Sequence, residues 1–280
     1  MEKIIAKKNS LSDLLNNFFK IEERGSSIRT EVLGGLTTFL TMAYIIFVNP
    51  AILSATGMDK GALITVTCLA TAIGTGIAAF WANAPFALAP GMGLNAFFTY
   101  TLVLGQGVPW EDALGVVFIS GLFFLIMTLG GIREKIANAI PSVVSTAATS
   151  GIGLFIAFIG LKNMGIIVSD SATFVALGDF SLPTVLGLLG LAIMVICEIK
   201  NIKGGILISI AITTILGIFT GIVNAPTAIV SMPPSISPIF MKLNILGALK
   251  ISLIGSIFSF MFIDLFDSLG FMMADRKSVV

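Results

Sequence analysis

Apolar stretches of about 20 residues recur along nearly the whole chain, and they limit its fold more than any other feature. A stretch of that length is what an α-helix needs to cross the hydrocarbon core of a bilayer. The 280-residue sequence is 56% apolar and 11% charged, whereas soluble domains carry about 25% charged residues. A chain with so little polar surface suits lipid rather than water. The sequence therefore predicts an all-α polytopic membrane protein embedded in a lipid bilayer.

We predict about eight membrane segments, at 32–53, 62–81, 86–104, 113–132, 147–168, 183–199, 204–223 and 249–271. The expected organisation is a cytoplasmic arm at 1–30, one transmembrane domain at 31–271 and a short atypical tail at 272–280. Residues 11–21 have the apolar spacing of a short surface helix, and a loosely ordered arm is the alternative.

Most of the 16 Lys and Arg residues fall on the side of the predicted bundle that holds the N-terminus. The positive-inside rule therefore predicts a cytoplasmic N-terminus for a multi-pass protein of the plasma membrane. On this topology Asp59, Glu111, Asp112, Asp170 and Asp179 are expected in external loops.

The composition argues against several classes of function. The sequence has no histidine and two cysteines, Cys68 and Cys197, both within apolar segments. We therefore expect no disulfide framework, no zinc site and no cofactor. A net charge of +1 gives no reason to expect a nucleic-acid partner. Because no serine–base pair or metal-ligand cluster is evident, an enzyme is not expected either.

The third segment differs from the others because it contains Pro85, Pro90, Gly91 and Gly93. Proline removes a backbone donor and glycine weakens a helix, so no regular helix is expected there. Broken backbone at membrane depth is tolerated where protein or a water-filled cavity satisfies the freed groups, and it is typical of transporter binding sites. We predict an extended stretch at 86–89 and a half-helix that begins near Asn95. A kinked packing helix is the alternative.

Two carboxylates, Asp264 and Asp267, lie inside the last apolar segment. A charged group at mid-membrane costs about 2.5–3.5 kcal/mol on insertion scales, so functional residues are expected at such positions. The i, i+3 spacing places both on one helix face, where neighbouring carboxylates in a low dielectric favour proton binding. A substrate and proton site is one interpretation, and a structural polar pair is the other.

Asn95 and Phe86 are the other candidate site residues. Asn95 has an amide that either caps the half-helix or offers donors and an acceptor to a planar heterocycle. The ring of Phe86, in the extended stretch, is a candidate for stacking on such a ligand.

Four runs of sequence resemble the AzgA-like hypoxanthine/guanine permeases of the nucleobase–cation symporter superfamily, which includes the xanthine and uracil permeases. The runs are TTFLTMAYIIFVNPAIL, ALAPGMGLNAFFTY, GIGLFIAFIGLKNMGI and FIDLFDSLG. They occur in the same order, and the resemblance extends from about Arg29 to Gly270.

The resemblance implies a fold of two inverted repeats of seven segments each, in which the third segment is a strand plus a half-helix. The present chain would then hold the first repeat and the first helix of the second. By motif position, Asp264 matches the substrate carboxylate, Asn95 a polar contact and Phe86 a ring beside the substrate. Asp267 also belongs to the pattern, and we assign proton coupling to Asp264 and Asp267.

The expected function is transport of a purine nucleobase (hypoxanthine, guanine or adenine), driven by H⁺ rather than Na⁺. Because the second repeat is missing, we expect a truncated chain that is inactive alone; saturable hypoxanthine binding would contradict this. The alternative is a non-transporting partner or regulator of a full-length permease, and a homodimer is also left open. An anion carrier of similar architecture is the nearest other transporter, but two central aspartates argue against it.

Overall fold

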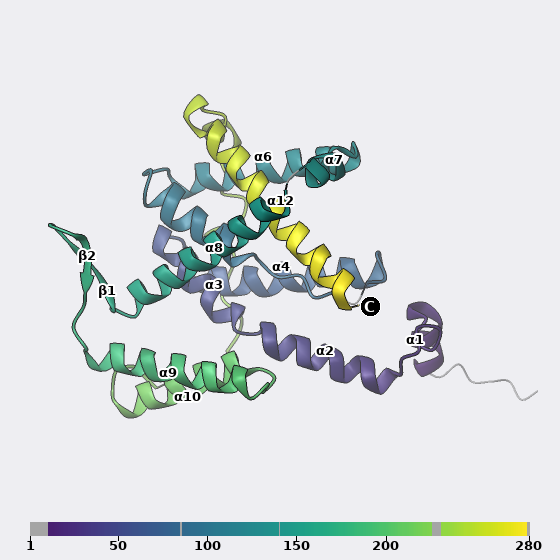
Figure 1. The fold of residues 1–280 in the computed structure, drawn as a ribbon, viewed down its shortest axis with the longest axis horizontal. Helices are drawn as coiled ribbons and strands as arrows, with labels where there is room; N and C mark the ends of the chain where they lie inside the picture. The colour runs from purple at the N-terminus through teal and green to yellow at the C-terminus, as the bar shows by residue number, and fades with distance from the viewer. Residues whose placement is uncertain (1–10, 85, 140, 226–230, 279–280) are drawn as a thin grey trace, which may run out of the picture.

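The computed structural model describes residues 11–84, 86–139, 141–225 and 231–278, and most of them are helical (Figure 1). In chain order the helical elements are α1 (Leu11–Phe19), α2 (Ile28–Met42), α3 (Ile45–Leu53), the 3-10 turn η1 (Ser54–Thr56), α4 (Lys60–Phe80), α5 (Met92–Ala96), the π-helical η2 (Phe97–Val103), α6 (Trp110–Leu129), α7 (Ile132–Ala139), α8 (Ser142–Asn163), α9 (Leu182–Ile199), α10 (Gly205–Phe219), α11 (Ile245–Ala248), the 3-10 turn η3 (Ile251–Leu253) and α12 (Ile254–Ser278). Predictions for residues 1–10, Pro85 and 226–230 lie outside the described residues.

Five apolar helical stretches in this part of the chain are long enough to cross a bilayer, by length and composition. They are Ile28–Thr56, Lys60–Phe80, Trp110–Leu129, Leu182–Ile199 and Ile251–Ser268. Two shorter apolar stretches are Met92–Val103 and Gly205–Phe219, and the 22-residue α8 covers most of the fifth predicted segment. The chain is thus mostly helical with several helices of membrane-spanning length, while the count of about eight crossings stays a prediction.

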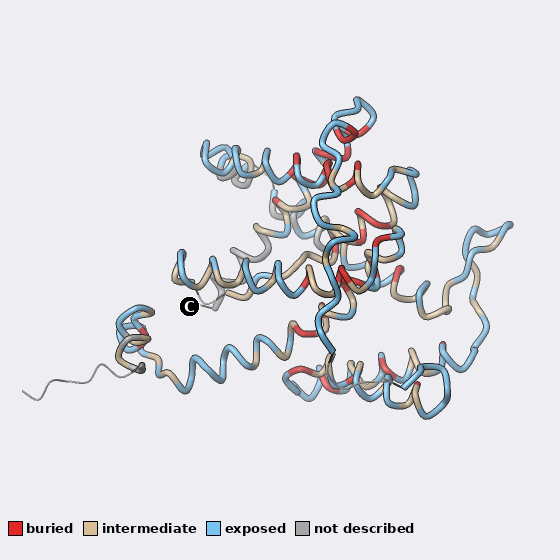
Figure 2. The backbone as a smooth tube through the Cα atoms, turned by 180° about the vertical axis from the view of Figure 1, so that it is seen from behind, coloured by how far each residue is buried: buried red, intermediate tan, exposed pale blue. Residues whose placement is uncertain are grey.

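One group of helices holds most of the buried residues, and a separate hairpin lies beside it. Helices α3, α4, α6, α8 and α12 gather together, whereas α9 and α10 pack on each other, with α10 also touching α2 (Figure 1). Buried backbone is concentrated in the larger group (Figure 2). Its apolar core includes Leu102, Val116, Leu253, Ile257 and Phe260. This core holds η2, α6 and α12 together and so fixes the walls of the site described below.

Large apolar side chains cover much of the outer surface of these helices. Along α2 and α6 the exposed ones are Val32, Leu33, Leu36, Phe39, Val117, Phe118, Leu122, Phe123, Leu125, Ile126 and Leu129. In water so large an apolar area would drive association, but it matches the acyl chains of a bilayer. The outer surface therefore agrees with a membrane protein.

An ion pair between a buried carboxylate and an exposed lysine joins the start of α6 to the segment that precedes α12. Asp112 is buried, and its carboxylate accepts from Lys250 Nζ at 2.8 Å and from Asn244 Nδ2 at 2.7 Å. The backbone N–H of Asn244 also donates to the carbonyl of Glu111 at 2.9 Å. The prediction that Asp112 lies in an external loop is therefore wrong. Its charge is buried because Lys250 and Asn244 satisfy it there.

Two glycines permit this contact between α6 and α11. A side chain at Gly115 would overlap the backbone oxygen of Asn244, and one at Gly247 would overlap the Asp112 carboxylate. Glycine is therefore needed at both positions for the helices to approach this closely.

Several predicted boundaries differ from the structure. The fifth segment ends at Asn163 rather than residue 168, because Gly165 takes a left-handed conformation (φ 78°) and an antiparallel hairpin of β1 (Ile167–Asp170) and β2 (Phe174–Leu177) follows. Backbone N–H groups of Thr173 and Ala172 donate to Asp170 and hold the pKa of its carboxyl below its usual range. Helix α12 continues to Ser278, through most of the predicted tail.

Candidate functional site

The chain between α4 and α5 forms neither helix nor strand at 86–91, so the break that the prolines and glycines predict is present, while an extended conformation at 86–89 stays a prediction. The half-helix begins at Met92, with Gly91 in the extended conformation (φ −71°, ψ 121°) before it. The prediction of a start near Asn95 is therefore wrong by about one turn. Gly93 does not break the helix because it provides room for Ile152 of α8, whose side chain occupies the space a Cβ would need.

The side chain of Thr75 on α4 makes hydrogen bonds to the backbone of this segment. Its hydroxyl accepts from the backbone N–H of Leu88 at 3.0 Å and donates to the carbonyl of Leu88 at 3.2 Å. Both backbone groups of Leu88 are thus satisfied by α4, which is how a break in a membrane segment can be stable.

We expect Thr75→Val to lower the free energy of unfolding by about 1–3 kcal/mol, because both Leu88 groups lose their partner in an apolar setting. The matched control is Thr128→Val on α6, whose hydroxyl bonds only to the carbonyl of Phe124 in its own helix. Thermal unfolding in detergent, followed by circular dichroism, gives the comparison. Equal losses for the two variants would contradict the role of Thr75.

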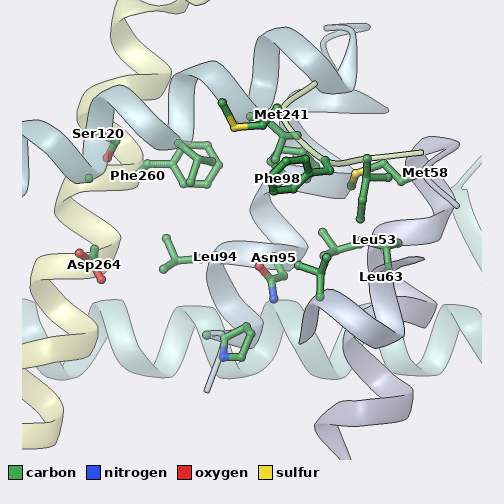
Figure 3. A pocket seen from close by; sticks show the side chains of 18 residues that line it. Leu53, Met58, Leu63, Leu94, Asn95, Phe98, Ser120, Met241, Phe260 and Asp264 are labelled. Atoms are coloured by element: carbon green, nitrogen blue, oxygen red, sulfur yellow. The ribbon is translucent and has the colours of Figure 1, made fainter. Parts of the chain in front are cut away.

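A cavity of about 540 Å³ opens beside this break (Figure 3). Its wall is formed mainly by the end of α3, the α5–η2 helix, α6 and α12, and the coil near residue 240 closes one side. The lining is mostly apolar and comprises Leu53, Met58, Leu63, Val66, Pro90, Gly91, Leu94, Asn95, Phe98, Leu114, Val117, Ser120, Gly121, Ile239, Phe240, Met241, Phe260 and Asp264. A volume of this size lies within the range of small-molecule sites, about 300–1,000 Å³.

The two aspartates of α12 do not occupy the same place. Asp264 is half-buried and lines the cavity, across Leu94 from Asn95 (Figure 3). Asp267 is exposed, and its Oδ2 lies 3.5 Å from the position that a Cβ on Gly91 would take. Asp264 therefore faces the cavity, while Asp267 adjoins the start of the half-helix.

The amide of Asn95 also faces the cavity and does not cap the half-helix. Its Nδ2 donates to Oδ1 of Asn49, a buried residue of α3. Asn49 Nδ2 in turn donates to the hydroxyl of Thr67 on α4 at 2.8 Å. The capping interpretation of Asn95 is therefore wrong, because this side chain bonds to another helix.

Phe86 is not brought together with Asp264 and Asn95. It lines a neighbouring cavity of about 800 Å³ between α2, α3 and α4, together with Thr67, Thr71 and Thr75. Stacking of Phe86 on a ligand beside Asp264 thus stays a prediction without support from the geometry of this cavity.

Comparison with known proteins gives the family. The model of the Permease family Xan_ur_permease matches residues 29–277. This chain belongs to that family. The permease is 51% identical over 257 residues to the putative permease MJ0326 of Methanocaldococcus jannaschii (91% of this chain, 59% of the relative). It is 44% identical over 258 residues to the adenine permease AdeP of Escherichia coli (92% and 58%). With the guanine/hypoxanthine permease PbuG of Bacillus subtilis it shares 41% over 272 residues (93% and 62%).

The resemblance to purine permeases is thereby confirmed, and the family indicates a membrane transporter rather than an enzyme. The permease chain spans about three-fifths of the length of these curated relatives.

The cavity of this chain suits a flat ligand with a few polar edges. Asp264 offers carboxylate oxygens, Asn95 an amide and Ser120 a hydroxyl, while Phe98 and Phe260 supply aromatic faces. Among the described residues, no group of three or more acidic, cysteine or histidine side chains gathers to hold a metal ion. The arrangement can bind such a ligand by hydrogen bonds and stacking.

Sequence reasoning missed Asn49, Thr67 and Asp112. Asn49 lies before Pro50 in the first apolar segment, and no partner for its amide is predicted from the sequence. An amide in the middle of an apolar segment is itself a signal, because it needs a partner from another helix. Asp112 carries a weaker signal, since acidic residues in a first helical turn are common at the surface.

Proposed function

We propose that the cavity lined by Asp264 and Asn95 binds a purine nucleobase, and that the permease carries this ligand across the plasma membrane. The observation that supports this most is the placement of a carboxylate and an amide on two sides of one apolar cavity. A purine has ring N–H groups that donate to such acceptors and a flat face that suits Phe98 and Phe260. The printed names of relatives, adenine permease and guanine/hypoxanthine permease, agree with this ligand class.

Proton coupling is the finer part of the proposal. The two aspartates of α12 are three residues apart, one in the cavity and one beside the half-helix. A proton taken up by this pair would alter its interactions with the ligand and with α5, and so bias the two orientations of the site. We propose H⁺ as the coupling ion in preference to Na⁺, and an N-terminus in the cytoplasm.

Binding of purified protein in lipid nanodiscs to tritiated hypoxanthine tests the site. All described lining residues belong to this chain, which supports binding by the chain itself. Such binding would contradict the expectation from the sequence that the chain is inactive alone. We expect saturable binding that unlabelled adenine or guanine competes away and sulfate does not. Absence of saturable binding would overturn the assignment of the ligand to this chain, and displacement by sulfate would favour an anion carrier. Uptake by cells that lack their own purine permeases then tests transport.

A further inference from the structure

A directional chain of hydrogen bonds runs through the wall behind the candidate cavity. Asn95 Nδ2 donates to Asn49 Oδ1, and Asn49 Nδ2 donates to Thr67 Oγ1 at 2.8 Å. The Thr67 hydroxyl donates to the carbonyl of Leu63 at 2.7 Å. Asn49 and Thr67 are buried, with 3% and 2% of their surfaces exposed. Three helical elements, α3, α4 and α5, are therefore linked by side chains, two of which, Asn49 and Thr67, are buried.

The direction of this chain is fixed at its far end. In the structure the single hydroxyl proton of Thr67 goes to the carbonyl of Leu63, which has no hydrogen of its own. Thr67 Oγ1 can then only accept, which requires the NH₂ group of Asn49 to face it. The oxygen of Asn49 is left for Asn95 and can only accept the NH₂ group of that residue. As long as the Thr67 hydroxyl donates to Leu63, each amide has one orientation, because a flipped amide would place two acceptors or two donors against each other.

The orientation of the Asn95 amide determines which of its atoms faces the cavity. With its nitrogen held by Asn49, its Oδ1 lies toward Leu94 and the side of the cavity where Asp264 lies (Figure 3). No protein donor to Asn95 Oδ1 occurs among the described residues. The ligand therefore meets a carbonyl acceptor at this point.

We propose that Asn49 and Thr67 are positioning residues that determine ligand specificity by holding the Asn95 amide with its oxygen toward the ligand. The inference rests on the proposed purine site. Since Asp264 also accepts when ionised, two acceptors converge on the ligand from opposite sides. A good ligand must carry N–H donors on two of its edges.

Hypoxanthine and unsubstituted purine have the same ring system but differ in their N–H donors, so comparing them tests the requirement for donors on two edges. Hypoxanthine has one N–H on its six-membered ring and one on its five-membered ring, whereas purine has only the latter. We expect hypoxanthine to bind about tenfold more tightly than purine, because purine leaves one protein acceptor without a donor. The ratio of the two affinities measures the orientation of the amide and is insensitive to a general loss of folded protein.

Two isosteric substitutions one turn apart on α4 give a matched test. Thr67→Val removes the acceptor that orients Asn49, so both amides are free to flip and the affinity ratio should fall toward 1. Thr71→Val makes the same change at a buried hydroxyl that has no hydrogen-bond partner in the described part of the chain, and the ratio should be retained. Thr67→Ser keeps the hydroxyl and should also retain it.

The experiment is competition of tritiated hypoxanthine by unlabelled hypoxanthine and purine on the purified chain in nanodiscs. The inference is supported if the ratio of the two affinities falls about tenfold for Thr67→Val and is unchanged for Thr71→Val and Thr67→Ser. Where Thr67→Val does not fold, Asn49→Leu tests the same step and should lower the ratio equally. An unchanged ratio in whichever of these variants is measured, or a wild-type ratio near 1, overturns the inference while the purine site stands. Absence of any purine binding by wild-type protein overturns the proposed function and this inference with it.

Discussion

Replacing Asp264 by asparagine is expected to lower purine affinity by about 10- to 150-fold and, in a form that transports, to abolish uptake, without preventing membrane insertion. Hydrogen bonds to a charged group contribute about 1.5–3 kcal/mol, and each 1.4 kcal/mol is a factor of ten. The substitution keeps the shape of the side chain but removes the charge and presents an NH₂ group to the ligand. Insertion should not suffer, because a neutral residue is less costly in a bilayer than a charged one.

Asp179→Asn is the matched control for this prediction, since Asp179 is exposed and far along the chain from the cavity-lining residues. Binding of tritiated hypoxanthine and the amount of variant in purified membranes are measured side by side. Normal affinity in Asp264→Asn would remove this carboxylate from the site, whereas equal losses in both variants would point to a general effect of charge.

Gly115→Ala is expected to cause the largest loss of stability, about 1–3 kcal/mol or more. The added methyl group would overlap the backbone oxygen of Asn244 and the side chain of Ala248. Backbone cannot move aside as a flexible side chain can, so α11 must separate from α6 and the Asp112–Lys250 ion pair must open. A buried carboxylate without its partner adds to the cost.

Gly121→Ala on the same helix is its control, because a Cβ at Gly121 meets open space. There the substitution should stabilise α6 by up to about 1 kcal/mol through helix propensity. Thermal unfolding of both variants in detergent gives the difference in their stabilities. The measurement is made without ligand, because Gly121 lines the cavity and its substitution could alter binding. Similar unfolding temperatures would show that α6 and α11 do not pack as described.

The apolar stretches and the break between α4 and α5 follow from the sequence, because they depend on local properties. Length and composition predict helices that cross a bilayer, and Pro90 with Gly91 predicts the extended backbone. The start of α5 is misplaced because tertiary packing offsets the low helix propensity of Gly93, where Ile152 of α8 occupies the space that a Cβ would need.

The partners of polar side chains could not be predicted, because they depend on how each helix is rotated about its axis. The sequence shows that Asn95 lies in a half-helix but not that Asn49, 46 positions earlier, faces it. The sequence could not show that Phe86 and Asp264 line different cavities, for the same reason. Asp112 was placed in a loop because its partner Lys250 is 138 positions away, far beyond the reach of local patterns.

The ion pair between Asp112 and Lys250 also bears on the order of events during synthesis. Helices α3 to α6 leave the ribosome long before Lys250 is made, so the pair cannot form while they insert. Until then the Asp112 carboxylate lies in the first turn of α6, where free backbone N–H groups and the helix dipole favour a negative charge. The wall that α12 contributes to the cavity is then added last, across a long loop closure. A nascent chain that stops before this point would hold the half-helix with Asn95 but lack the carboxylate of Asp264.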